Sequence, residues 1–134
     1  MGCAPAEEQP RRDAPAEAEL TAFELEHGIG PFTEEVILPP TIDEQLAAEG
    51  REIFEMNCAA CHEMDMRLVG PPLGDVVERR SPTFIMNIIM NPEEMVRNHP
   101  EGQAMLAQYP IVMPYQNITP DEARAILEYL RTVE

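Results

Sequence analysis

Two cysteines and a histidine stand together near the middle of the chain, in the run Cys58-Ala59-Ala60-Cys61-His62. A Cys-x-x-Cys-His run is the attachment signature of a c-type haem. The spacing has a chemical reason, because each thiol can add to one vinyl group of the porphyrin and the next residue then lies beneath the iron. An imidazole nitrogen in that place can ligate the metal. We therefore expect one covalently bound haem c, attached through Cys58 and Cys61, with His62 as an iron ligand.

Three other interpretations of the cysteine pair fit the residues less well. Half of a zinc site would need four ligands in total, and the remaining candidates, Cys3, His27 and His99, show no ligand spacing. A thioredoxin-like redox pair would need a βαβ pattern around it, which the sequence lacks. A structural disulfide would close only a very small loop. The haem interpretation fits the residues best.

A haem iron held by histidine needs a second axial ligand, and the chain has nine methionines. Met64 and Met66 follow His62 too closely to reach the other face of the ring. Five further methionines lie in or near helical or apolar stretches, and we interpret them as core residues. They are Met56, Met86, Met90, Met95 and Met105.

Met113 differs from these methionines, because it lies in an expected loop directly before Pro114 and the last helix. A loop can lay the thioether against the iron, and the proline stiffens the exit of that loop. His99 is the rival ligand. We predict Met113, since histidine–methionine ligation is a known haem pattern that raises the reduction potential.

The chain is strongly acidic, with 25 acidic residues, nine basic ones and a net charge of −16. All nine basic residues are arginine, and lysine is absent. Such a chain is repelled by nucleic acid and by anionic lipid head groups, so we expect no nucleic-acid partner. It has no run of about 18 apolar residues that would span a membrane, and no signal-peptide core.

The composition divides the chain into three parts. Residues 1–19 are rich in Ala, Pro and Glu and predict a flexible tether. Cys3 follows Gly2, as in a bacterial lipoprotein cut before its lipidated cysteine, so we expect a membrane tether at Cys3. Residues 20–40 carry an apolar run that should pack on the domain, with His27 at the surface. Residues 41–134 form the domain itself.

Helix signals fill this domain, and strand signals are nearly absent, so we predict a mainly α fold. The first helix should begin with Thr41 as its N-cap, with Asp43 and Glu44 in its first turn. It should run directly into Cys58.

Three more helix boundaries can be read from proline and capping residues. Ser81-Pro82 begins the second helix, and Asn91-Pro92 ends it and begins a short third one. Residues 98–118 are rich in turn formers. The run Thr119-Pro120-Asp121-Glu122 is a capping box that begins the last helix.

Residues 41–134 resemble class I cytochrome c, a family of small carriers with a single haem. The stretch 50–58 is similar to the first helix of that family, with Gly50 and Phe54 where it crosses the last helix. The ending Glu128-Tyr129-Leu130-Arg131 is similar to the family's C-terminal helix, with Ile126 and Tyr129 as the reciprocal contacts. The resemblance implies a few helices wrapped around one haem.

Two loops carry the same resemblance. Gly70-Pro71-Pro72-Leu73 is similar to a family loop in which the carbonyl of the proline, here Pro71, accepts the proton of the ligating histidine. Met113-Pro114, followed by a capped helix, is similar to the segment that holds the axial methionine. The resemblance therefore adds Pro71 to the cofactor-binding residues and supports Met113.

The chain departs from the family in two ways. It lacks a lysine patch, so partner docking does not carry over, and residues 20–40 have no counterpart in the minimal fold. These residues either wrap the domain or cover an edge of the haem. Arg67 and Tyr115 are candidates for contacts near the haem or its propionates, with solvated surface as the alternative.

The resemblance implies a single-electron carrier and not an enzyme. It implies shuttling in a respiratory chain, with a quinol-oxidising complex as donor and a haem-copper oxidase as acceptor. Bacterial haem attachment takes place outside the cytoplasm, so we expect the protein at the periplasmic, extracytoplasmic face, made with an export signal. We also expect it to be a monomer. Two alternatives stay open: an electron-entry subunit of a larger oxidoreductase, and a haem enzyme or gas sensor with an open sixth site.

Overall fold

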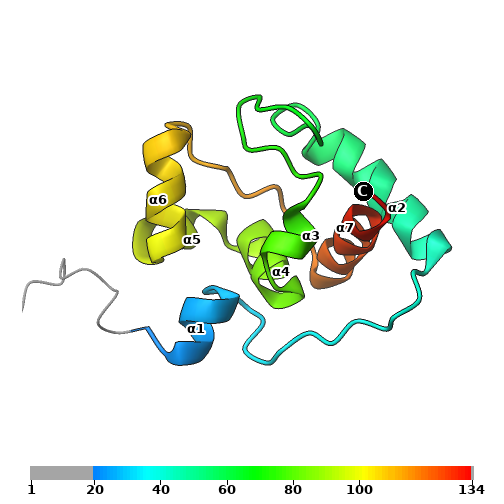
Figure 1. The fold of residues 1–134 in the computed structure, drawn as a ribbon, viewed down its shortest axis with the longest axis horizontal. Helices are drawn as coiled ribbons and strands as arrows, with labels where there is room; N and C mark the ends of the chain where they lie inside the picture. Colours follow the sequence, from blue (N-terminus) through cyan, green and yellow to red (C-terminus); the bar gives the residue numbers. More distant parts are fainter. Residues whose placement is uncertain (1–19, 134) are drawn as a thin grey trace, which may run out of the picture.

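The computed structural model describes residues 20–133, which form seven helices and no strand (Figure 1). The helices are α1 (Ala22–His27), α2 (Glu44–Asn57), α3 (Val76–Arg79), α4 (Pro82–Met90), α5 (Pro92–Asn98), α6 (Pro100–Gln108) and α7 (Pro120–Thr132). The prediction of a mainly α fold is confirmed. In this range no helix has the length and apolar character needed to cross a membrane. The predicted tether and Cys3 lie outside the described residues.

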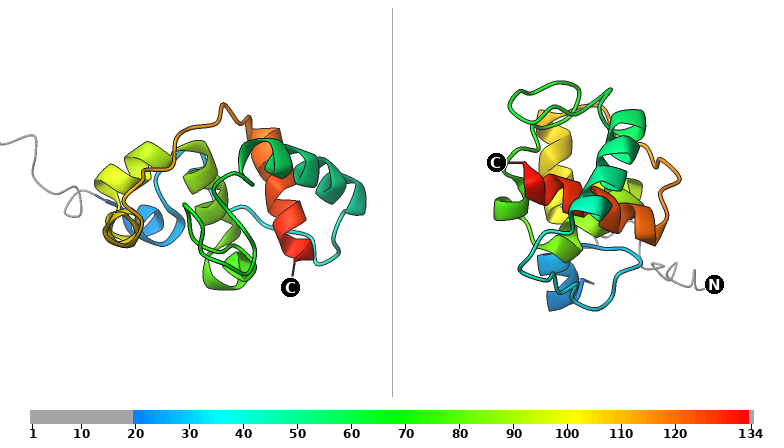
Figure 2. Two further views of the ribbon diagram at one scale, coloured as in Figure 1. Left: turned by 90° about the horizontal axis from the view of Figure 1, so that it is seen from above. Right: turned by 90° about the vertical axis from the view of Figure 1, so that its right-hand side faces the viewer.

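The first and last helices of the domain cross closely, as the motifs implied. The views of Figures 1 and 2 agree in placing α2 beside α7. At the crossing Gly50 is buried, and a Cβ there would stand 1.8 Å from the carbonyl oxygen of Ala125, so only glycine permits this approach. The ring of Phe54 lies 5.4 Å from the ring of Tyr129. Phe54 and Ile126 belong to one buried cluster.

The start of α2 lies two residues later than predicted. Asp43, and not Thr41, is the N-cap, because its carboxylate accepts a hydrogen bond from the backbone N–H of Leu46 at 3.0 Å. The Asp43 N–H in turn donates to the buried carboxylate of Glu128 at 2.9 Å. The backbone of Asp43 is extended, with φ of −82° and ψ of 102°, as is typical of an N-cap residue, so the first helical residue is Glu44.

Proline in the first turn begins four of the helices, α4 to α7. The predicted starts at Ser81 and Thr119 are confirmed, since each side chain accepts from the backbone N–H three residues later. Helix α6 was not predicted. Its cap is His99, whose Nδ1 accepts from the N–H of Glu101 at 3.1 Å, and histidine is not among the preferred capping residues.

Residues 20–40 lie along one side of the helical core (Figure 1). They are held by buried polar side chains of α4. The Asn87 amide donates to the carbonyls of His27 (2.9 Å) and Phe32 (3.1 Å), and its oxygen accepts from the Phe32 N–H at 3.0 Å. The hydroxyl of Thr83 accepts from the Val36 N–H at 2.8 Å. These hydrogen bonds join the segment of residues 20–40 to α4.

Two side chains lie where the sequence did not place them. His27, expected at the surface, is only 6% exposed, and its Nδ1 is hydrogen-bonded to the Ser81 hydroxyl at 2.8 Å. The reason is that α1 packs on the start of α4. Met56, interpreted as a core residue, is 84% exposed, because it lies on the outer face of α2.

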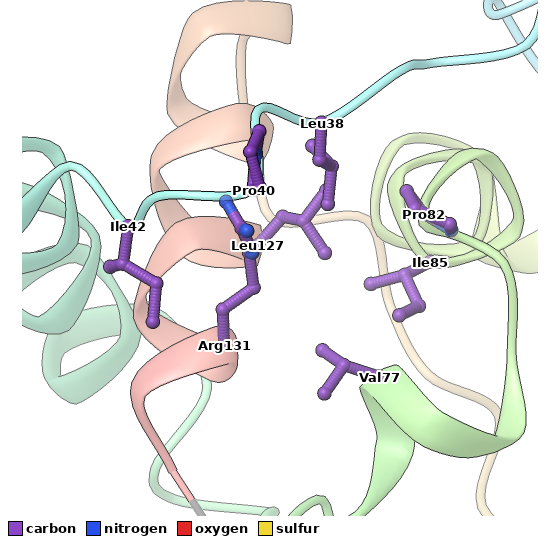
Figure 3. Close-up of a pocket in the computed structure, with 8 residues that line it drawn as sticks. All are labelled: Leu38, Pro40, Ile42, Val77, Pro82, Ile85, Leu127 and Arg131. Atoms are coloured by element: carbon purple, nitrogen blue, oxygen red, sulfur yellow. The ribbon is translucent and has the colours of Figure 1, made fainter.

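A small cavity of about 280 Å³ lies between residues 38–42, α3, α4 and α7 (Figure 3). Its walls are apolar except for Arg131, which donates to the Pro39 carbonyl at 2.7 Å and to Glu128 at 2.9 Å. Arg131 thus ties the segment before α2 to α7. The cavity has no cysteine, histidine or methionine in its lining.

Candidate haem site

A larger cavity of about 530 Å³ lies among α2, α4, the residues around α6 and the loops beside them. This volume falls in the range of ligand sites, roughly 300–1,000 Å³. Cys58, Cys61, His62 and Met113 all line it, so the chain brings the predicted residues together. The apolar part of the wall includes Phe54, Val76, Phe84, Ile85, Ile88, Ile89, Ile126 and Leu130.

The cysteines sit where α2 ends. Cys58 is the C-cap, and the backbone N–H groups of Cys61 and His62 both donate to its carbonyl, at 3.1 and 3.0 Å. This turn brings both half-buried thiols to the cavity, and they are not joined by a disulfide. Burial raises the pKa of the Cys58 thiol to about 11, with a smaller effect from Cys61.

The zinc interpretation has no support in the described part of the chain. Over residues 20–133 no three His, Cys, Asp or Glu side chains gather as a possible metal site. His27 and His99 are both engaged elsewhere, with Ser81 and with the backbone of α1.

The imidazole of His62 is oriented by the loop that follows it. Its Nδ1 lies 3.0 Å from the Pro71 carbonyl oxygen. A carbonyl can only accept, so Nδ1 carries the proton and Nε2 keeps a free lone pair. Gly70 lies against the ring, where a Cβ would stand 2.5 Å from Cε1. The loop therefore fixes both the tautomer and the position of the ring.

Met113 belongs to the segment between α6 and α7, which has no helix. It is half-buried and lines the cavity. The far end of the segment is fixed by Asn117, with φ of +56°, and by the capping box of Thr119 and Glu122. Asparagine is one of the few residues that tolerate this left-handed conformation.

The rival ligand His99 lies away from the cavity. It is 1% exposed, its Nε2 donates to the carbonyls of Glu24 (2.9 Å) and Leu25 (3.2 Å), and its Nδ1 accepts from Glu101. Both ring nitrogens are engaged with backbone. Among the other methionines, Met105 also lines the cavity, from α6, although the sequence indicated only a core role for it.

Polar residues that the sequence did not single out also line the cavity, notably Arg79, Arg80 and Gln116. Arg80 donates to Glu101 at 2.9 Å, and this hydrogen bond holds the pKa of the Glu101 carboxyl below its ordinary value. Neither Arg67 nor Tyr115 is among the lining residues. No residue of the described segment 20–40 lines the cavity either, so this segment wraps the core instead of covering the site.

A cavity with a Cys-x-x-Cys-His wall, a histidine held in the ligating tautomer and a thioether fits haem c. The family model for cytochrome c matches residues 47–134. The chain belongs to the cytochrome c family. It therefore binds haem c, with its iron, covalently, and Cys58 and Cys61 supply the Cys-x-x-Cys-His motif. The family's function is electron transfer, and this cytochrome c is an electron carrier in that broad sense.

Relatives support the assignment. The chain is 30% identical over 96 residues to cytochrome c-551 of Stutzerimonas stutzeri, covering 66% of this chain and 81% of the relative. It is 33% identical over 88 residues to a cytochrome c-553-like protein of Synechocystis, covering 65% and 69%. Among solved structures, cytochrome c from Rhodothermus marinus matches with a TM-score of 0.77 and 41% identity, over 81% of this chain and 93% of that one. The predicted fold is therefore confirmed.

Proposed function

We propose that this cytochrome c carries single electrons on an iron held between His62 and Met113. Haem c would supply an iron that takes one electron from a donor protein and gives it to an acceptor protein. No covalent bond is made or broken in this transfer. The observation that carries the proposal is that His62 and Met113, from different elements, line one cavity together with both cysteines. His99, by contrast, has both ring nitrogens engaged elsewhere.

The chain's own residues have distinct roles in this proposal. The Pro71 carbonyl, 3.0 Å from Nδ1 of His62, keeps Nε2 free to ligate and strengthens it as a donor. The Met113 thioether would be the second protein ligand of the iron, and such a ligand raises the potential. An iron held by both His62 and Met113 would have no open place for a substrate or a gas. This favours a carrier over an enzyme or sensor.

The surface around the cavity suits transient contact with another redox protein. Val69, Leu106, Ile111 and Val112 all line the cavity and are also exposed, by 38%, 39%, 64% and 41%. An apolar rim of this kind is typical of a protein interaction site. We assign electron entry and exit to this edge.

The wider setting rests on family resemblance and on the N-terminal sequence. We place this cytochrome c in a respiratory chain, between a quinol-oxidising complex and a haem-copper oxidase. It works as a monomer at the periplasmic, extracytoplasmic face, with a lipid tether at Cys3, which follows Gly2 as at the cleavage site of a lipoprotein precursor. Mass spectrometry of the native protein, purified from its host membranes, tests the tether. An unmodified Cys3 would exclude it.

The alternative of a permanent subunit in a larger oxidoreductase finds less support. It would use the apolar run of residues 20–38 as an interface. Phe32, Val36 and Leu38 instead pack on the chain's own core cluster. Gel filtration of the protein from its native host separates the two, since a carrier elutes alone and a subunit elutes with its complex.

The visible spectrum tests the ligation. For the oxidised protein we expect the weak far-red band of sulfur-to-iron charge transfer, and for the reduced protein no change on adding carbon monoxide. Met113→Ala should abolish the band, lower the potential and allow carbon monoxide to bind. Met105→Leu is the matched control, because it removes the other thioether that lines the cavity. If Met105→Leu loses the band and Met113→Ala keeps it, Met105 is the ligand.

A further inference from the structure

The loop after His62 is a closed unit with a projecting tip. The backbone N–H groups of Gly70, Leu73 and Gly74 donate to the carbonyls of Cys61 (2.7 Å), Glu63 (2.9 Å) and Met64 (2.8 Å), respectively. These bonds join the two ends of the loop, and residues 65–69 form its tip. Figure 1 shows this tip, in green, extending toward the end of α6, where the orange segment begins.

Arg67, at this tip, contacts the end of α6. Its guanidinium lies over the ring of Tyr109, 4.1 Å from the centroid, and its Nη2 donates to the carbonyl of Gln108. Gln108 is the last residue of α6, Tyr109 is its C-cap, and both line the cavity. Arg67 therefore links the loop that orients His62 to the first residues of the segment that carries Met113.

The Arg67 contact lies at the start of the segment that carries Met113. Its far end is held by Asn117 and by the capping box of α7. Between these two ends, Ile111 and Val112 are exposed. Among the hydrogen bonds, ion pairs and cation–π contacts within residues 20–133, only those of Arg67 join the start of this segment to the loop of His62.

We propose that Arg67 is a positioning residue that clips the Met113 segment to the His62 loop and so keeps the Met113 thioether in place. The inference rests on the proposed ligation by Met113. An arginine suits the role, because one planar group both stacks on an aromatic face and donates to a carbonyl. Lysine would keep the charge but lose the planar stacking. The clip sets how readily an added ligand displaces Met113.

The test measures imidazole binding to the oxidised holoprotein by the loss of the far-red band. Arg67→Met keeps the apolar stem and removes both contacts. We expect its association constant for imidazole to rise about tenfold, equal to about 1.4 kcal/mol. Tyr109→Leu removes the other partner of the contact and should give a similar rise in the association constant. The constant of Arg67→Lys should lie between those of wild type and Arg67→Met. Thermal unfolding of each variant verifies that it is folded.

Two controls make the outcome decisive. Arg51→Met removes another exposed arginine, which pairs with Glu55 on α2, outside the cavity lining, and should leave imidazole binding unchanged. The double variant of Arg67 and Tyr109 should bind imidazole no more tightly than the single variant that binds it best. The reason is that both changes remove the same contact. The clip is rejected if Arg67→Met and Tyr109→Leu both bind as Arg51→Met does. If the oxidised wild-type protein shows no far-red band, the proposed ligation of the iron by Met113 is itself rejected.

Discussion

Gly50 of α2 and Ala125 of α7 meet backbone to backbone, with the Ala125 carbonyl oxygen 1.8 Å from the place of a Gly50 Cβ. The contact sets how closely the two helices cross. It also places the C-terminal end of α2, where Cys58 is the cap, beside the cavity. A single missing side chain thus helps to position the haem attachment site.

Gly50→Ala should destabilise the fold by about 1–3 kcal/mol, because the added methyl group overpacks against backbone that cannot move aside. This holds although alanine is favoured over glycine in helices by about 1 kcal/mol. Urea unfolding gives the free energy. Glu49→Ala, on the exposed side of the same helix, is the control and should change stability by less than about 0.5 kcal/mol. Equal stability of Gly50→Ala and wild type would contradict the prediction.

Gly70→Ala should disturb His62 directly, since the new Cβ would stand 2.5 Å from Cε1 of the imidazole. We expect the ring to shift away from the Pro71 carbonyl, the far-red band to weaken, and the unfolding free energy to fall by about 1–3 kcal/mol. Ala60→Ser, an exposed change between the two cysteines, serves as control. An unaltered spectrum in Gly70→Ala would show that the ring has room the structure does not provide.

Glu128 predicts a pH dependence of stability. It is fully buried, and its carboxylate accepts hydrogen bonds from Arg124, Arg131 and the Asp43 N–H. Burial acts to raise the pKa of this carboxyl, but the three donors outweigh it and hold the pKa below its ordinary value. Such a group stabilises the fold above its unfolded pKa, about 4.3. The contribution is lost as the pH falls through the lower, folded value.

Glu128→Gln should therefore lower the unfolding free energy by about 3 kcal/mol at pH 7, because it leaves buried donors facing a neutral group. The gap from wild type should shrink as the pH falls below about 4. Glu55→Gln, which breaks the exposed pair with Arg51, should cost at most about 1 kcal/mol. Urea unfolding at several pH values measures the unfolding free energies of wild type, Glu128→Gln and Glu55→Gln. A gap that stays constant with pH would contradict the account.

Asn87→Ala should loosen residues 20–40. The change removes the amide that bonds to the backbone of His27 and Phe32 and leaves buried groups without partners, at a cost of about 1–3 kcal/mol. Hydrogen exchange should become faster in residues 27–36, while α7 stays protected. Gln103→Ala, an exposed amide on α6, should leave exchange in that segment unaltered. Faster exchange everywhere would indicate general destabilisation instead.

Local sequence was sufficient where the deciding interactions are short-range. The cysteines and His62 are neighbours in the chain, and their spacing matches the chemistry of one cofactor, so the haem could be predicted directly. The caps at Ser81 and Thr119 depend on bonds three residues long, and both were predicted. The place of Met113 on the cavity wall also agrees with the sequence, whereas its bond to iron stays a prediction.

Long-range packing decided the rest. The Asp43 N–H bonds to the buried Glu128 of α7, and packing of α1 on α4 buries His27, although Asp43 and His27 both look like surface residues in their own stretch of sequence. Arg67 and Tyr109 are likewise far apart in the chain, and only the fold brings them together. The sequence by itself determined that the cofactor is haem c, that the fold is mainly α and that the chain belongs to the cytochrome c family. The tertiary structure decided which side chains surround the cofactor, because such contacts depend on how distant segments pack and not on residue type or spacing.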